Sequence, residues 1–190
     1  MNSKEKILTA ALSCFTEHAI EGTSIEMIRD ASGTSVGSIY HHFKNKQGVV
    51  AALFVQGIHE YHEDLYKQLQ TSKTAESGVR NIVTSYISWV AKNPEWARFV
   101  LYSREKIYEE TAIKLIEDEN REINARFNEW FKVHFDSGAI QKLPMEIFFA
   151  LVLGPAQLYA RRWVSGRAEQ KNLLKYKTIF SQSAWLSVQA

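Results

Sequence analysis

The sequence predicts an all-α protein. Only three of its 190 residues are proline and nine are glycine, too few for the many turns of an all-β fold. Apolar side chains recur at helical spacing through most of the chain, and no pair of alternating stretches indicates paired strands. Because 45% of the residues are hydrophobic and 12% aromatic, the chain can bury one sizeable core or two small ones.

The first two helices are predicted from capping signals. Asn2 and Glu5 have the spacing of a capping box, and the apolar stripe that follows ends near Phe15. Thr23 and Glu26 form a second Thr-x-x-Glu box, in which hydroxyl and carboxylate would each accept a hydrogen bond from a free backbone N–H. We therefore expect a second helix to begin at Thr23.

A tight turn separates the second and third helices. Gly33 is expected to end the second helix, and Ser35 to cap a third over about residues 35–42. Two helices joined so closely are typical of a helix-turn-helix. Asn45 is expected to cap a fourth helix that runs to about Leu69.

A polar stretch over residues 70–76 interrupts the pattern and predicts a domain boundary. Residues 1–48 are expected to form a three-helix helix-turn-helix domain, with a linking helix over 46–69. Residues 70–190 would form a C-terminal helical bundle. Its helices are expected at about 77–92, 94–107, 110–135, 144–166 and 170–188.

Acidic residues are absent from Ala31 to His59, although they are spread through the rest of the chain. A surface that meets a phosphate backbone needs donors and positive charge without carboxylates, because each neutralised phosphate releases counterions. Residues 1–50 as a whole carry no net charge with histidine neutral. DNA binding would therefore depend on where the charges lie.

The third helix would place its first residues against base edges in the major groove. Small hydroxyls and the methyl groups of Val36 suit base contacts, while the aromatic and basic residues further along suit phosphates. Ile39 and Phe43 are expected to anchor this helix in the core. The predicted DNA-binding residues are Thr23, Thr34, Ser35, Val36, Ser38, Tyr40, His41, Lys44 and Lys46.

The segment Thr23–Lys46 (TSIEMIRDASGTSVGSIYHHFKNK) resembles the N-terminal domain of TetR-family transcriptional regulators. The close resemblance covers about residues 4–55. One departure is Ala19, where the family commonly has glycine. Unless the turn shifts to Gly22, Ala19 would be strained in a left-handed conformation. The matching positions are Gly33, Ser35, Gly37, Tyr40, His42, Phe43 and Lys46.

The resemblance implies a homodimeric repressor that a small-molecule effector releases from a palindromic operator in double-stranded DNA. It also implies an effector pocket among the C-terminal helices and a dimer interface made by the last two helices. The long fourth helix would couple the two domains.

Aromatic residues are dense between residues 86 and 163. For any single one the helical core is the better interpretation, but together they leave irregular space that a small ligand can occupy. The predicted pocket residues are Tyr86, Trp89, Phe99, Tyr102, Phe127, Trp130 and Phe148. The last two helices also carry more apolar surface than a small bundle needs, which a homodimer would bury. The predicted interface residues are Leu151, Leu158, Trp163, Leu173, Phe180 and Trp185.

Other chemistry is less well supported. His59, His62 and Glu63 could bind zinc from one helix face, but they supply few ligands. Cys14, the only cysteine, rules out an intramolecular disulfide and suits the cytoplasm, whereas a redox sensor would need an exposed, electropositive site. With no signal peptide and no long apolar run, we expect a cytoplasmic protein without membrane contact. We also expect no enzymatic activity, no metal and no cofactor.

Two further interpretations remain open. A transcriptional activator would use the same residues and differ only in where its operator lies. A helical small-molecule-binding protein, whose helix pair only packs, would not bind DNA at all.

Overall fold

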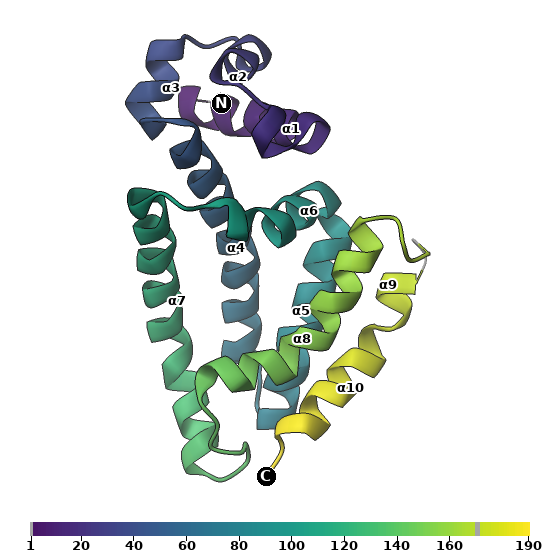
Figure 1. The fold of residues 1–190 in the computed structure, drawn as a ribbon. Coiled ribbons are helices and arrows are strands. Elements are labelled where there is room, and N and C mark those ends of the chain that lie inside the picture. The colour runs from purple at the N-terminus through teal and green to yellow at the C-terminus, as the bar shows by residue number, and fades with distance from the viewer. Residues whose placement is uncertain (1, 170–171) are drawn as a thin grey trace. The chain divides into compact units, whose positions relative to one another are not determined.

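The computed structural model describes residues 2–169 and 172–190, and within them the all-α prediction is confirmed. Its helices pack in two compact units (Figure 1). In chain order they are α1 (Ser3–Gly22), α2 (Ile25–Ser32), α3 (Val36–Phe43), α4 (Lys46–Thr71), α5 (Ala75–Lys92), α6 (Pro94–Ser103), the 3₁₀ turn η1 (Arg104–Lys106), α7 (Glu110–Asp136), α8 (Met145–Val164), α9 (Asn172–Lys175) and α10 (Lys177–Val188).

The first unit extends to His59 and also includes Glu95–Asn120. The second unit comprises Glu60–Pro94 and Arg121–Ala190. This division differs from the predicted boundary at residue 70, because α6 and the start of α7 share an apolar core with α1 and the start of α4. Long-range packing of this kind leaves no mark in local composition.

The start of α1 follows the predicted capping box. The Glu5 amide donates to Asn2 Oδ1 at 2.9 Å, and the Asn2 amide donates to Glu5 Oε2 at 3.0 Å. The predicted box at the start of α2 is wrong by one residue. Ser24 is the N-cap, and its Oγ accepts from the Met27 amide at 3.2 Å.

Two predicted helices are divided in the structure. The helix expected over 94–107 ends at Ser103 and tightens into η1, after which Ile107 turns into the core. The helix expected over 170–188 is interrupted at Tyr176, whose ψ of 3° leaves the helical range. The predicted start of that helix lies outside the described residues.

The core of the first unit holds α3 in place. Ile39 and Phe43 are buried in one cluster with Ile28 of α2 and Phe15 of α1, as predicted. The ring of Phe15 stacks on Phe99 of α6 with 5.8 Å between centroids. Helix α3 is therefore fixed along one side by apolar contacts.

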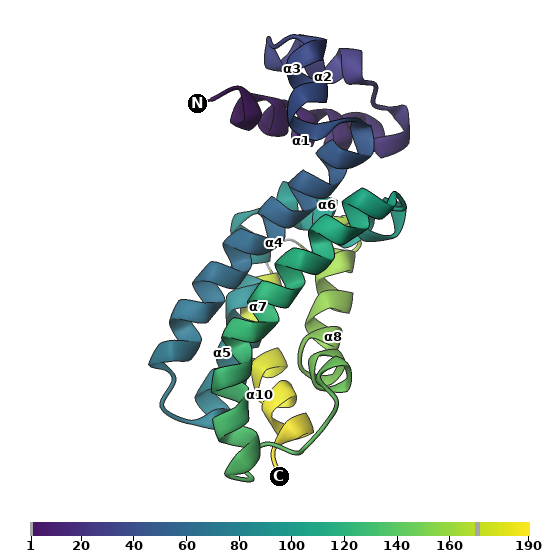
Figure 2. The ribbon, with the colours of Figure 1, turned by 90° about the vertical axis from the view of Figure 1, so that its left-hand side faces the viewer.

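In the second unit, α5, α8 and α10 pack against one another (Figure 2). The side chains of Phe131, Phe148 and Leu173 are among its most deeply buried. At Gly78 the backbone lies directly against the Trp130 ring, where a Cβ atom would come within 1.9 Å of Cζ2. Only glycine permits this approach.

Helix α1 kinks at Ala19, which has φ 59° and ψ 170°. The turn does not shift to Gly22, so the strain expected at Ala19 is confirmed. This region of backbone space is almost confined to glycine, and other residues there cost about 1–3 kcal/mol. The surrounding packing must therefore hold Ala19 in place.

Replacing Ala19 by glycine should raise the free energy of unfolding by about 1 kcal/mol, since glycine adopts this conformation without strain. Urea denaturation followed by circular dichroism measures the change. Ala125→Gly, within the regular helix α7, is the matched control and should instead lower stability by about 1 kcal/mol. Equal losses in both variants would show that Ala19 is not strained.

Candidate nucleic-acid interface

The turn between α2 and α3 is determined by two opposite capping signals. Gly33 adopts the left-handed conformation, with φ 64°, and its amide donates to the Arg29 carbonyl at 3.0 Å to end α2. Two residues later Ser35 caps α3, its Oγ accepting from the Ser38 amide at 3.1 Å. These contacts form the predicted helix-turn-helix.

The Gly33–Gly37 run also has the Gly-x-Ser-x-Gly spacing of a nucleophile elbow. That motif requires the serine on a sharp turn from strand to helix. Here Ser35 follows a helix instead, and its Oγ accepts the capping hydrogen bond of α3. The run therefore serves the turn, and its geometry is not that of a hydrolase.

Burial of Ile39 and Phe43 leaves the other side of α3 exposed. Tyr40 is 48% exposed, and His41 and Lys44 are exposed beside it. With no acidic residue from Ala31 to His59, this face offers donors and positive charge without nearby carboxylates from its own segment. It has the chemistry expected of a phosphate-binding surface.

The residues predicted to read bases gather at the start of α3. Thr34 Oγ1 lies 2.8 Å from Ser32 Oγ, and Ser38 Oγ lies 2.8 Å from Ser3 Oγ. A hydroxyl has one donor and two acceptor sites, so these contacts leave capacity for a base edge. Ser35 is exposed and Val36 is partly buried against the core.

Two residues predicted to contact DNA, Thr23 and Lys46, also have internal roles. Thr23 is only 2% exposed, and its hydroxyl lies within hydrogen-bond distance of the carbonyl oxygens of Cys14 and Ala19. The Thr23 hydroxyl therefore has an internal role, and a DNA contact at this helix end would involve backbone N–H groups. Lys46 Nζ donates to the carbonyls of Ile20 and Thr23, both at 2.9 Å. These two hydrogen bonds satisfy carbonyl groups at the end of α1. The third ammonium proton of Lys46 remains available for a phosphate.

Sequence reasoning missed a basic hollow beside α3. Lys4, His42 and Lys44 line this space of about 320 Å³ within the first unit. Lys4 lies on the first turn of α1, far from α3 in sequence, so no local pattern could connect them. The hollow extends the positive surface next to the predicted phosphate contacts.

The seven predicted pocket residues do not form one set. Phe99 and Tyr102 belong to the first unit, and the other five belong to the second. Phe148 is fully buried among phenylalanines, with its ring centroid 5.0 Å from that of Phe131, which places it in the core. The rings of Tyr86 and Trp89 both contact Tyr61.

Some aromatic side chains of the second unit have unpaired polar atoms. Tyr86 Oη, Trp89 Nε1 and Trp130 Nε1 are buried without a hydrogen-bond partner among the described residues. Burial raises the pKa of the Tyr86 phenol, which therefore stays neutral.

Phe127 packs on Tyr66, with 6.1 Å between ring centroids.

The predicted dimer residues lie on α8, α9 and α10. Leu158 is 67% exposed and Leu151 is also exposed, while Trp163, Phe180 and Trp185 are partly buried. Leu173 is 1% exposed, so it belongs to the core of the second unit and its predicted interface role is wrong. The prediction also missed exposed apolar side chains on the same helices, namely Ile147, Leu174, Ile179 and Leu186.

Within residues 2–169 and 172–190, no group of three or more His, Cys, Asp or Glu side chains could hold a metal ion. In the same residues, no helix has the length and apolar character needed to cross a membrane.

Residues 7–53, which contain this helix-turn-helix, match the family described as bacterial regulatory proteins, tetR family. This N-terminal segment of the chain is similar to the TetR family. Among curated relatives, the transcriptional repressor AcnR of Corynebacterium glutamicum is 42% identical over 52 residues. That match spans 27% of this chain and 28% of AcnR. The matched region is thus little more than a quarter of the length of this curated relative.

Two solved structures share the fold over nearly the whole chain. A TetR-family regulator from Shewanella sp. PV-4 superposes with a TM-score of 0.81 at 19% identity, covering 100% of both chains. FadR from Bacillus subtilis, solved with stearoyl-CoA, gives a TM-score of 0.79 at 16% identity, covering 95% of this chain and 96% of FadR. At these identities the likeness concerns the fold. AcnR is named as a transcriptional repressor rather than an enzyme, in agreement with the prediction.

Replacing Lys46 by alanine should lower the free energy of unfolding by about 1–2 kcal/mol, because two carbonyls at the end of α1 lose a charged donor. Urea denaturation measures this loss. Lys44→Ala is the matched control, since Lys44 is exposed, and its effect should stay within about 0.5 kcal/mol. If the two variants were equally stable, the Lys46 contacts would contribute nothing to the fold.

Proposed function

We propose that this protein is a homodimeric transcriptional repressor of the TetR family that binds a palindromic operator in the cytoplasm and is released by a small molecule. The observation that carries the proposal is the exposed, acid-free face of α3. Burial of Ile39 and Phe43 orients this face, so that Tyr40 and Lys44 are free to meet phosphates. The match of residues 7–53 to regulatory proteins supports the same function.

In the proposed complex, the start of α3 enters the major groove. Thr34, Ser35, Val36 and Ser38 contact base edges, and Val36 suits a thymine methyl group. Tyr40, His41 and Lys44 bind phosphates and set the orientation of the helix. The remaining ammonium proton of Lys46 is available for a further phosphate.

Dimerisation would pair two α3 helices about a two-fold axis. The exposed leucines of α8, together with the apolar side chains of α10, form the surface that we assign to the interface. Two half-sites about one helical turn apart would then fit the two recognition helices. A palindromic operator follows from this symmetry.

The effector is proposed to bind in the second unit. Tyr86, Trp89, Phe127 and Trp130 provide apolar walls there, and all but Phe127 carry a buried polar atom without a partner among the described residues. Such atoms can bind polar groups of a ligand. Since FadR of similar fold was solved with stearoyl-CoA, acyl-CoA thioesters are the first class to screen. An effector releases the operator only if it binds the DNA-free form better.

Lys44→Ala should weaken binding to every DNA sequence and reduce the slope of log K against log salt by about one, since one phosphate contact is lost. Mobility-shift titrations over a range of salt concentrations, using fragments selected from the source genome, measure both quantities. Lys92→Ala, an exposed lysine of the second unit, is the matched control and should change neither.

Val36→Ala, tested on the same fragments, should alter the preference among operators by about 1–3 kcal/mol at one base position. An equal loss on all sequences would contradict base contact by Val36. Unchanged affinity of Lys44→Ala would contradict the proposed orientation of α3.

Leu158→Glu should weaken the dimer by at least about a hundredfold, because a charge would enter a desolvated apolar interface. Sedimentation equilibrium measures the dimer dissociation constant. Val133→Glu, at a similarly exposed position of α7 in the second unit, is the matched control and should leave it unchanged. A monomeric wild-type protein, or an unaffected Leu158→Glu dimer, would overturn the assignment of this surface.

A further inference from the structure

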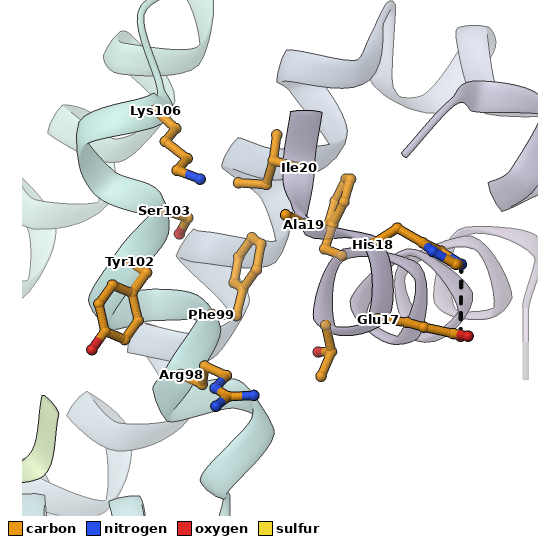
Figure 3. A pocket seen from close by; sticks show the side chains of 11 residues that line it. Glu17, His18, Ala19, Ile20, Arg98, Phe99, Tyr102, Ser103 and Lys106 are labelled. Carbon is orange, nitrogen blue, oxygen red and sulfur yellow. Dashed lines mark ion pairs between the residues drawn. The ribbon is translucent and has the colours of Figure 1, made fainter. Parts of the chain in front are cut away.

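The first unit contains a cavity that the proposed effector site does not use. It has a volume of about 480 Å³ and lies between the C-terminal part of α1 and the α6–η1 segment (Figure 3). Pockets that bind small molecules have volumes of about 300–1,000 Å³. Phe99 and Tyr102, two of the predicted effector residues, line this cavity instead.

Flat apolar side chains form much of the lining. Phe15 and Phe99 stack with an interplanar angle of 14°, and Ile20 and Tyr102 add further apolar surface. Stacked rings of this kind offer an extended contact for another planar or branched apolar group. The body of a ligand that fits here is therefore apolar.

A buried hydroxyl in the lining has no partner. Ser103 is 1% exposed, and its Oγ forms no hydrogen bond with any described residue. Leaving such a group unpaired is unfavourable, and each case in a native structure calls for an explanation. A polar ligand atom would supply the missing partner.

The charges around the cavity favour an anion. In Figure 3 the guanidinium of Arg98 and the ammonium of Lys106 extend toward α1, whereas the side chains of Glu17 and His18 extend away from Phe99. Lys106 is paired with Glu21 at 2.8 Å, and its hydrogen bond lowers the pKa of Glu21, so this pair is ionised. Arg98 forms no ion pair within residues 2–169 and 172–190 and is the available cation.

The opposite wall includes the strained residue Ala19. Strained backbone persists only where the surroundings hold it, and it concentrates at ligand-binding and switch positions. Lys46 Nζ bonds to the carbonyl of the next residue, Ile20, so contacts from α4 also determine the position of this wall.

We propose that this cavity binds a small amphipathic acid, with an aromatic or branched apolar body and one carboxylate. The body packs against Phe15 and Phe99. The carboxylate accepts hydrogen bonds from the Arg98 guanidinium and the Ser103 hydroxyl. Every lining residue belongs to the unit that carries the helix-turn-helix, so such a ligand acts on that unit directly.

Isothermal titration calorimetry of the full chain without DNA tests the site, with indole-3-acetate as probe and indole-3-acetamide as its uncharged counterpart. The acid should bind at least about tenfold more tightly than the amide, because only the acid forms a charged pair with Arg98. Arg98→Gln should remove this difference, because it weakens binding of the acid and leaves binding of the amide unchanged. Adding Ser103→Ala to this variant should weaken binding of the acid further. Arg167→Gln, an exposed arginine of the second unit, is the matched control and should change neither affinity.

Crystals soaked with 5-bromoindole-3-acetate locate the ligand by anomalous scattering, and the bromine should lie between α1 and α6. Bromine found only in the second unit, equal affinity of acid and amide, or no heat of binding at millimolar acid would each overturn the proposal. Any effect of the acid on operator affinity rests on the proposed function and is measured separately by mobility shift. A protein that binds the acid but no DNA would refute the proposed function and leave the site intact.

Discussion

The burial of Ile39 and Phe43 is the constraint on which the exposed surface of α3 depends. Helix α3 has eight residues, too few to be stable alone, so apolar contacts with α1 and α2 must hold it. These two side chains, four positions apart, also determine its rotation about its own axis. Tyr40 and Lys44 are exposed as a direct consequence. The exposed chemistry of α3 therefore follows from core packing, and any change that loosens this core also moves Tyr40 and Lys44.

At the end of α1, two side chains with the chemistry of DNA contacts instead form hydrogen bonds within the fold. The kink at Ala19 leaves backbone carbonyls that need donors, and the Thr23 hydroxyl and the Lys46 ammonium provide them. A buried carbonyl without a partner is unfavourable, so this internal role takes precedence over a possible phosphate contact. The same wall borders the cavity beside α6. The strained backbone of Ala19, the hydrogen-bonded carbonyls at the end of α1 and the cavity wall thus involve the same few residues.

The aromatic side chains have different surroundings in the two units. In the first, Phe15 and Phe99 stack beside a cavity that also presents a free guanidinium and an unpaired hydroxyl. In the second, Phe131 and Phe148 fill the core, while Tyr86 and Trp89 keep buried polar atoms that no other described residue pairs. Aromatic density alone did not distinguish these roles. The position of each polar atom does, because an unpaired donor in a buried site indicates what a ligand must supply.

The sequence by itself determined the helical class, the caps at Asn2 and Ser35, the turn at Gly33 and the anchors of α3. These features depend on residues within a few positions of one another, whose capping and helical spacing are local. It misplaced the cap of α2 and the role of Leu173. It could not show that α6 packs with α1, that Lys4 lies beside Lys44, or that Ser103 is left without a partner. Only the tertiary structure decided these points, because burial and hydrogen-bond partners depend on contacts between residues far apart in the chain.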